Sequence, residues 1–154
     1  MTDATGGGAV DLGATHVALP VTDLDRSIEF YERYASMQVV HRRTDTAGGS
    51  GVAWLSDLTR PFVVVLIAAD AVSGGLTGWA HLGVGVDSRD EVDRIAAAAR
   101  SENLKVQGPT DSGAPVGYWA FVADPDGHNL EVSFGQEVGL VVARHSDPPG
   151  DSTD

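Results

Sequence analysis

Cysteine is absent from the 154-residue sequence, and basic residues are scarce. Without cysteine the chain can form neither a disulfide bond nor a metal site built on thiolates. The 10 lysines and arginines face 22 aspartates and glutamates, which gives a formal net charge of −12. Because nucleic-acid phosphates attract lysine and arginine, an acidic chain is a poor partner for them. We therefore expect no nucleic-acid partner.

The sequence also lacks long apolar runs and a targeting signal. Hydrophobic residues make up 42% of the chain, in runs well short of the roughly 20 residues that cross a bilayer. The first residues, Met1 to Gly13, have neither the basic start nor the apolar core of a secretory signal. We expect no membrane segment and a location in the cytoplasm.

What the sequence does contain is a strand that begins with histidine and occurs twice. The segment HVALPV at His16–Val21 has a counterpart in HLGVGV at His81–Val86. Each copy runs into a polar helix start of the capping-box type, at Thr22–Asp25 and Ser88–Glu91. A histidine in an isolated strand is usually a packing residue, but two at the same place in a duplicated unit suggest a paired site.

Each copy continues with one helix and three further strands. The helices are predicted by apolar residues at helical spacing, namely Leu24, Ile28, Tyr31 and Ala35, then Val92, Ile95, Ala96 and Ala99. The expected strands are Thr15–Val21, Met37–Thr44, Gly51–Leu55, Phe62–Ala68, Trp79–Val86, Leu104–Gln107, Val116–Ala123 and Asn129–Phe134. The predicted fold class is α+β, built from two βαβββ modules.

We expect one domain at residues 14–136, with modules at about 14–70 and 77–136 that are separated at Ser73–Gly75. Residues 1–13 are predicted to be a flexible leader, and residues 47–50 a flexible loop. Residues 137–154 would be a C-terminal extension whose end, from Asp147, is disordered.

Strand parity suggests a metal site. His81 shares its face with Gly83 and Gly85, and Glu131 lies on the opposite face from the large aliphatic residues of its strand. A glutamate in a half-buried strand needs a partner or a cation. Two neutral imidazoles and one carboxylate form a recognised metal set with open positions. The alternative is that His16 and His81 are packing residues and Glu131 is a surface residue.

Three stretches resemble the vicinal oxygen chelate superfamily. They are HVALPV followed by DRSIEFY at Asp25–Tyr31, HLGV at the second histidine, and DPDGHNLE at Asp124–Glu131. This superfamily includes glyoxalase I, extradiol dioxygenases, fosfomycin-resistance transferases, methylmalonyl-CoA epimerase and bleomycin-binding proteins. The resemblance covers about Thr15 to Phe134. It implies a cupped mixed β-sheet with helices packed outside, and one divalent metal with His16, His81 and Glu131 at ligand positions.

Departures from the family pattern narrow the expected function. The repeat places Val65 opposite Glu131, where glyoxalase I and the epimerase carry a fourth ligand that can exchange a proton. Phe121 stands where extradiol dioxygenases and fosfomycin enzymes commonly have tyrosine, and Ala18 stands where the fosfomycin enzymes use a hydroxyl. A phosphonate would also require a cluster of cations. Glyoxalase and fosfomycin activities are therefore ranked below dioxygenase chemistry.

The turn before the last strand decides which aromatic residues lie near the metal. If the turn ending at Gly127 forms a glycine bulge, Phe121 pairs across from Glu131. Trp119 then faces the same side, and the repeat gives Trp54 a corresponding place. A tight turn without the bulge would send Tyr118 and Ala120 inward. We favour the bulge, which predicts a substrate pocket of Trp54, Trp119 and Phe121, although aromatic strand residues are often only core. His128 is expected to lie outside the metal shell.

The sequence thus favours a mononuclear divalent-metal enzyme that oxygenates or cleaves an aromatic or polyketide-like small molecule. Iron(II) is preferred, and manganese, nickel, cobalt and zinc also accept these ligands. The alternative is a bleomycin-resistance-like protein that sequesters an aromatic antibiotic, and a glyoxalase-type lyase or isomerase or a fosfomycin-type thiol transferase ranks lower. By resemblance we expect a homodimer, with a site in one chain or shared by two. The pattern identifies no catalytic acid or base.

Overall fold

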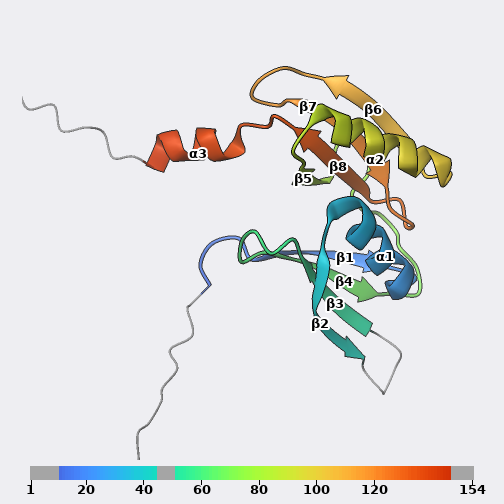
Figure 1. Ribbon diagram of the computed structural model, residues 1–154. Coiled ribbons are helices and arrows are strands. Elements are labelled where there is room, and N and C mark those ends of the chain that lie inside the picture. Colours follow the sequence, from blue (N-terminus) through green and yellow to red (C-terminus); the bar gives the residue numbers. More distant parts are fainter. Residues whose placement is uncertain (1–10, 45–50, 147–154) are drawn as a thin grey trace, which may run out of the picture. The chain divides into compact units, whose positions relative to one another are not determined.

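The computed structural model describes residues 11–44 and 51–146 (Figure 1). The chain divides into two compact units, Met1–Ser73 (unit 1) and Gly74–Asp154 (unit 2). Most of the predicted leader, the predicted flexible loop at 47–50 and the predicted disordered end lie outside the described residues. Each unit contains one four-stranded sheet, and the helix that follows its first strand packs against that sheet.

Unit 1 has the element order of the predicted first module. Its elements are β1 (His16–Val21), α1 (Leu24–Ala35), β2 (Gln38–Thr44), β3 (Gly51–Ser56) and β4 (Val63–Ala68). The sheet order is β1-β4-β3-β2, with β1 and β4 parallel and the other pairs antiparallel. Helix α1 begins at Asp23, whose side chain accepts a hydrogen bond from the Arg26 N–H, and it ends where Ser36 turns left-handed with φ 51°.

Unit 2 repeats this order and adds a helix. Its elements are β5 (Leu82–Gly85), α2 (Arg89–Ser101), β6 (Val106–Asp111), β7 (Tyr118–Ala123), β8 (Asn129–Phe134) and α3 (Val138–Ser146). The sheet order is β5-β8-β7-β6, with β5 and β8 parallel. The Ser88 hydroxyl accepts from the Glu91 N–H at 3.2 Å, so the predicted cap begins α2.

Helices α1 and α2 pack with the apolar faces that their spacing predicts, although Leu24 at the start of α1 is only half-buried. In α2 the buried residues are Val92, Ile95, Ala96 and Ala99. In each sheet, alternate side chains form the core beneath the helix. The fully buried strand residues include Val21, Leu55, Val64, Leu66, Val122, Leu130 and Val132. The predicted α+β class with two βαβββ modules is confirmed.

The sheet of unit 1 has one covered face and one open face. On β4, Val64 and Leu66 are buried, whereas Ile67 is 39% exposed and its alternate neighbours are half-buried. The apolar run of this strand therefore has only one buried face, the one on the side of α1. The open face of the sheet carries His16 and Ala18 of β1, which are exposed.

Three elements differ from the sequence prediction. Strand β5 is shorter than expected, so Trp79 and His81 precede it. Strand β6 extends past Gln107 to Asp111, through a register shift at Gly108 and Pro109. Helix α3 was not predicted at all, and it has no buried residue.

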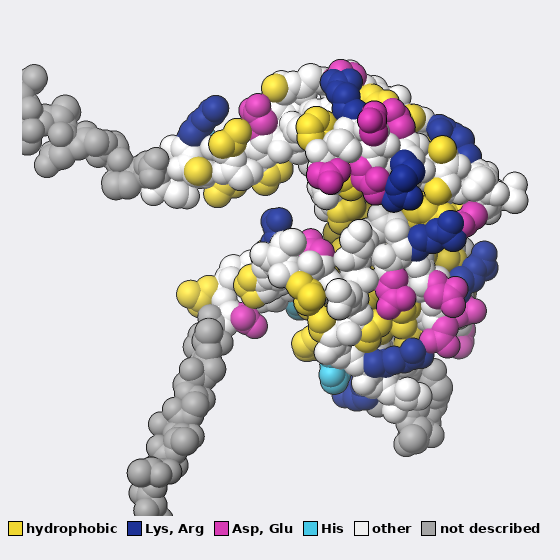
Figure 2. Space-filling model, viewed as in Figure 1, with side chains coloured by type: hydrophobic (Ala, Val, Ile, Leu, Met, Phe, Trp, Pro, Cys, Tyr) yellow, Lys and Arg dark blue, Asp and Glu magenta, His cyan; other side chains and the backbone are white. Residues whose placement is uncertain are grey.

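Exposed apolar side chains run along α3, which follows the end of β8 (Figures 1 and 2). No helix within the described ranges is long and apolar enough to span a membrane. The cytoplasmic location stays a prediction.

Candidate functional site

The two sheets place different side chains at equivalent positions of their register. In unit 1, Ala18 on β1 pairs with Val65 on β4. In unit 2, Gly83 on β5 pairs with Glu131 on β8. Val65 is therefore the counterpart of Glu131, as the repeat predicts. An aliphatic side chain in one unit corresponds to a carboxylate in the other.

The turn before β8 determines which side chains of β7 lie beside Glu131. Gly127 adopts a φ of 88°, as the predicted glycine bulge requires. Phe121 lies directly opposite Glu131 in the antiparallel pair. The favoured register is confirmed, and the alternative that sends Tyr118 and Ala120 inward is excluded.

His81 and Glu131 come together in unit 2. The Nε2 atom of His81 lies 3.5 Å from Oε2 of Glu131. Glu131 is only 6% exposed, whereas the His81 side chain is one-third exposed. A buried carboxylate must be compensated by hydrogen bonds, a cationic side chain or a metal ion. Glu131 is thus a functional candidate on burial alone, and the imidazole of His81 is a neighbour of its Oε2.

The other oxygen of Glu131 is bound by Gln136, which the sequence reading did not single out. The Gln136 amide Nε2 donates a hydrogen bond of 2.6 Å to Oε1 of Glu131. Gly135, with φ 80°, turns the chain after β8 and allows this return. Gly117 lies against the same turn, and a Cβ at that position would clash with the carbonyl oxygen of Phe134. Glycine at 117 therefore lets Gln136 reach the carboxylate.

The nitrogen of His81 that faces Glu131 is suited to bind a metal. Nδ1 of His81 lies 2.7 Å from the carbonyl oxygen of Trp79. A carbonyl can only accept, so Nδ1 carries a proton and Nε2 of the neutral ring holds its lone pair. Two ligand atoms about 2.1 Å from one divalent ion are about 3 to 3.5 Å apart. The 3.5 Å between His81 Nε2 and Glu131 Oε2 fits that spacing.

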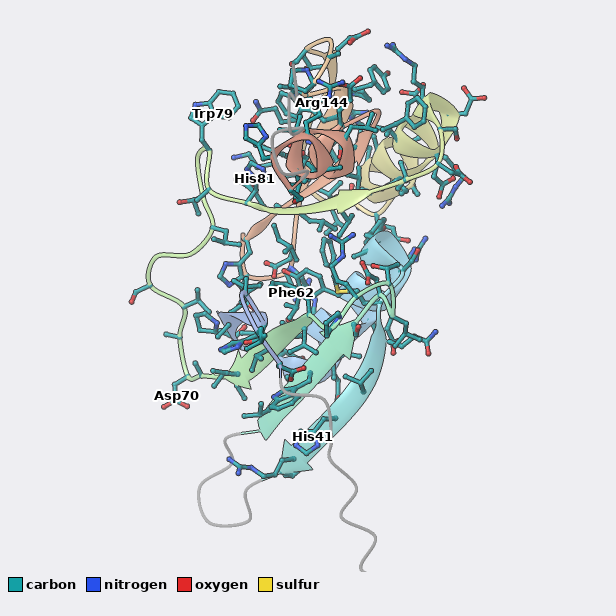
Figure 3. All side chains as sticks on the ribbon, turned by 90° about the vertical axis from the view of Figure 1, so that its left-hand side faces the viewer. His41, Phe62, Asp70, Trp79, His81 and Arg144 are labelled. Atoms are coloured by element: carbon teal, nitrogen blue, oxygen red, sulfur yellow. The ribbon has the colours of Figure 1, made fainter. Side chains whose placement is uncertain are left out.

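An aromatic cluster stands beside this pair. The Phe121 ring centroid lies 4.9 Å from the centroids of both His81 and Trp119, and 6.2 Å from that of Trp79. Phe121 and Trp119 are buried, whereas Trp79 is 75% exposed (Figure 3). Trp79 was not predicted as a pocket residue. Its place two positions before His81, on the same face by strand parity, was the available signal.

His16 lies in unit 1, where it lines a pocket of about 510 Å³. Its Nδ1 is 2.9 Å from the hydroxyl oxygen of Thr15. The predicted pocket residue Trp54 also lines this hollow and is 42% exposed. The remaining apolar lining consists of Ala18, Val40, Pro61, Phe62, Val63, Val65 and Ile67, and the other polar lining residues are Asp11, Thr15, Ser56 and Arg60. The roles of Trp54, Trp119 and Phe121 in substrate binding stay predictions.

His128 is a buried residue of unit 2 that has a structural role. It is 1% exposed, and its Nδ1 accepts a hydrogen bond of 3.1 Å from the N–H of Leu76. A Cβ at Gly75 would lie 2.6 Å from the His128 ring, so the glycine permits this contact. The ring thereby ties the segment before β5 to the start of β8.

The predicted metal ligands are divided between the two units. His81 and Glu131 belong to unit 2, and His16 belongs to unit 1. Within either unit, the part of the chain that the structure describes holds no cluster of three or more His, Cys, Asp and Glu side chains. The three-ligand site therefore stays a prediction.

Sequence comparisons identify related proteins. The family model described as Glyoxalase/Bleomycin resistance protein/Dioxygenase superfamily matches residues 13–132. The chain is 35% identical over 128 residues to the protein PA2024 of Pseudomonas aeruginosa, covering 81% of this chain and 90% of that protein. It is 32% identical over 123 residues to a probable lactoylglutathione lyase of Vibrio cholerae, covering 76% and 86%.

Solved structures share the fold. Glyoxalase I of Leishmania major superposes with a TM-score of 0.63 and 23% identity, over 88% of this chain and 94% of that chain. The fosfomycin resistance protein FosX of Listeria monocytogenes, in complex with Mn(II) and a dihydroxypropylphosphonic acid, superposes with a TM-score of 0.67 and 16% identity, over 86% and 99%. At these identities the likeness shows the fold alone.

Proposed function

The chain belongs to the glyoxalase/bleomycin resistance protein/dioxygenase superfamily, whose members typically bind a divalent metal and a small molecule, and we propose that it is a mononuclear divalent-metal enzyme. Its ligands would be His16, His81 and Glu131. Its reaction would be the oxygenation or ring cleavage of a flat aromatic or polyketide-like substrate. Iron(II) is the preferred ion in this proposal.

The observation that carries the proposal is that Val65 of unit 1 occupies the position equivalent to Glu131 of unit 2. A fourth protein ligand at that place would leave fewer open positions and could exchange a proton with the substrate. Valine does neither. A set of two histidines and one carboxylate leaves room for a bidentate substrate and for dioxygen, which is the set used by non-haem iron oxygenases.

The side chains of unit 2 support the metal ligands. Gln136 binds one oxygen of Glu131 through a hydrogen bond. The other oxygen lies near His81 and would remain available to a bound ion. The Trp79 carbonyl fixes the proton of His81 on Nδ1. When bound, a divalent ion would supply Lewis-acid activation of two neighbouring substrate oxygens. The buried Phe121 beside His81 would limit the access of water.

The shape and chemistry of the unit 1 pocket support a flat apolar substrate. Its lining is mainly aliphatic and aromatic and includes Trp54, Phe62 and His16. Its volume of about 510 Å³ suits a small molecule of one or a few rings. Arg60 is the one lysine or arginine among its lining residues, which argues against a phosphonate substrate.

A second candidate is a glyoxalase-type isomerisation. It is favoured by the relatives, because the Vibrio cholerae protein at 32% identity bears the name lactoylglutathione lyase. It is opposed by Val65, since the isomerisation moves a proton and valine cannot carry one. A third candidate, sequestration of an aromatic antibiotic without chemistry, would need no metal ligands.

Metal analysis of the purified protein tests the proposal. We expect about one divalent ion per chain in the wild type, and loss of that ion in His16→Ala, His81→Ala and Glu131→Ala. His145→Ala, an exposed histidine on α3, is the matched control and should retain the ion. Negligible metal in the wild type, or unchanged metal in all three variants, would reject the enzyme and favour the sequestering protein.

Activity measurements then separate the two reactions. Oxygen uptake with catechols or polycyclic quinols would support the oxygenase. Conversion of the hemithioacetal of methylglyoxal and glutathione to lactoylglutathione, without oxygen uptake, would replace it with the lyase. We also propose a homodimer, and sedimentation equilibrium measures it directly; a mass of one chain would reject that part.

A further inference from the structure

Arg60 lines the unit 1 pocket, and it forms no ion pair within 4.0 Å with any residue that the structure describes. Other arginines of the described chain are paired with carboxylates, as Arg42 is with Asp25 at 2.7 Å, and Arg94 with Glu91. The Arg60 guanidinium is instead hydrogen-bonded to the hydroxyl oxygen of Thr59. Arg60 is thus a cationic side chain of the pocket lining whose guanidinium is hydrogen-bonded to a hydroxyl and lies near the carboxylate of Asp57.

A hydrogen-bonded turn orients the Arg60 side chain. Oδ1 of Asp57 accepts from the N–H of Thr59 at 2.9 Å and from its hydroxyl at 2.7 Å. The Thr59 oxygen in turn accepts from Nε of Arg60 at 3.3 Å. Burial raises the pKa of Asp57, but the hydrogen bonds from Thr59, together with the charge of Arg60 and a backbone hydrogen bond, lower it below its ordinary value. The carboxylate is therefore charged at neutral pH, and it holds the turn through Thr59.

This chain of contacts leaves the two terminal nitrogens of Arg60 for a ligand. Arginine presents these nitrogens as a planar fork that matches a carboxylate. Arg60 itself is exposed, and the rest of the lining is mainly apolar, so a bound ligand would shield its contact with Arg60 from water in part. Asp11, also in the lining, opposes an anion but forms no ion pair with Arg60 within 4.0 Å.

We propose that the ligand of the unit 1 pocket is an aromatic carboxylate, whose ring lies among the apolar residues and whose carboxylate is bound by Arg60. A single guanidinium suits one monoanionic carboxylate better than a doubly charged phosphonate, which needs several cations. This inference rests on the proposed function only in that the proposed substrate occupies the same pocket. It makes Arg60 a specificity-determining residue.

The test compares two probes of the same shape, 1-naphthoate and its uncharged analogue 1-naphthamide, bound to the full-length protein. Isothermal titration calorimetry is run with and without a chelator, so that a contact between carboxylate and metal is measured separately. We expect naphthoate to bind about tenfold more tightly than naphthamide in both conditions, the size of one charge-assisted hydrogen-bonded pair. Arg60→Gln should abolish this preference and leave the affinity for naphthamide unchanged.

Arg26→Gln is the matched control, because Arg26 is exposed on α1 and is absent from the pocket lining. It makes the same change in net charge and should retain the preference. Equal binding of the two probes by the wild type, loss of the preference in the Arg26 control, or no binding of either probe would overturn the inference. If the purified wild type holds no metal but still prefers naphthoate, and Arg60→Gln removes that preference, the carboxylate site stands and the proposed enzyme is rejected.

Discussion

The two units of this chain have the same element order but carry different chemistry at equivalent positions. Where unit 2 has the buried Glu131, unit 1 has Val65, and the strand neighbours differ in the same way. Phe121, opposite Glu131, is 3% exposed, whereas Trp54, opposite Val65, is 42% exposed. Unit 2 has a packed polar pair, and unit 1 has an open apolar pocket.

This difference shows how a duplicated scaffold can divide a function. Each unit carries one histidine at the start of or just before its first strand, and in unit 2 this histidine lies beside Glu131, whose other oxygen is bound by Gln136. Unit 1 surrounds its histidine with Trp54, Phe62 and other apolar side chains. Unit 2 thus offers an imidazole beside a buried carboxylate, and unit 1 offers an imidazole beside a mainly apolar hollow.

The largest expected effect comes from making unit 2 resemble unit 1. Loss of a residue that supports a metal ligand typically lowers metal affinity roughly 10- to 100-fold. Glu131→Val removes a proposed ligand itself, so the loss of metal affinity should be larger. Valine is β-branched and suited to a strand, so the circular dichroism spectrum should be retained. Equilibrium dialysis with a metal chromophore measures the affinity, and an unchanged affinity would remove Glu131 from the ligand set.

The next effect concerns Gln136, which has no counterpart in the described part of unit 1. Gln136→Ala should weaken metal binding about 10- to 100-fold, because Oε1 of Glu131 loses its donor and the carboxylate is no longer directed. Gln38→Ala, an exposed glutamine at the start of β2, is the control and should bind metal like the wild type. If both variants bind alike, Gln136 does not position the ligand.

The turns that precede β4 and β8 each contain a hydrogen-bonded aspartate, and the one in unit 2 is more buried than the one in unit 1. Asp124, 4% exposed, accepts hydrogen bonds of 2.9 Å from the N–H groups of Asp126 and His128. Asp124→Ala should cost about 1–3 kcal/mol of the free energy of unfolding because buried donors lose their acceptor. Asp57→Ala, in the more exposed turn of unit 1, should cost about 0.5–1.5 kcal/mol. Urea denaturation measures both, and a larger loss at Asp57 would contradict this ranking.

Adding the missing carboxylate to unit 1 should give a smaller change. Val65→Glu is expected to tighten metal binding by roughly tenfold, because an added anionic oxygen is a favourable ligand for divalent ions. Val65→Gln, which adds a neutral ligand of similar size, should give a weaker gain. If the dialysis assay shows no gain for either variant, Val65 does not face the metal.

The smallest effect is the pH dependence of the Asp57 turn. The folded pKa of Asp57 lies below its ordinary value of 3.8, so its contribution to stability is present above pH 3.8 and is lost as the pH falls through the lower folded value. The stability difference between the wild type and Asp57→Asn should therefore shrink on acidification from near pH 6 to about pH 3. A difference that grows on acidification would contradict the direction of the shift.

Periodicity and the repeat predicted both helices, the strand order along the chain and the counterpart relation of Val65 and Glu131. These features follow from local alternation, which each strand and helix displays in its own residues. Helix α3 was not predicted because it buries no residue, so its sequence shows no single apolar stripe at helical spacing. The extension of β6 escaped because Gly108 and Pro109 are ordinarily loop residues, and here they occupy a register shift.

The candidate site was predictable only where strand parity applies. His81, Glu131 and Phe121 lie on or beside regular strands, so alternation places them on one face. Gln136 lies beyond the strand, after a glycine with φ 80°, and no alternation rule follows the chain through such a turn. Arg60 likewise projects from a turn held by Asp57 and Thr59, which the sequence does not show as an oriented group.

The tie between His128 and the segment before β5 has a consequence for the thermodynamics of ion binding. The N–H of Asn129 donates to the Leu76 carbonyl at 2.7 Å, and the Asn129 side chain donates to the Gly78 carbonyl at 2.9 Å. The chain that carries His81 is thereby fastened to the strand that carries Glu131. Because folding has already fixed both backbones, an incoming ion meets little remaining conformational entropy to remove in unit 2. The temperature dependence of metal affinity would then report dehydration of the ion and its ligands more than ordering of the protein.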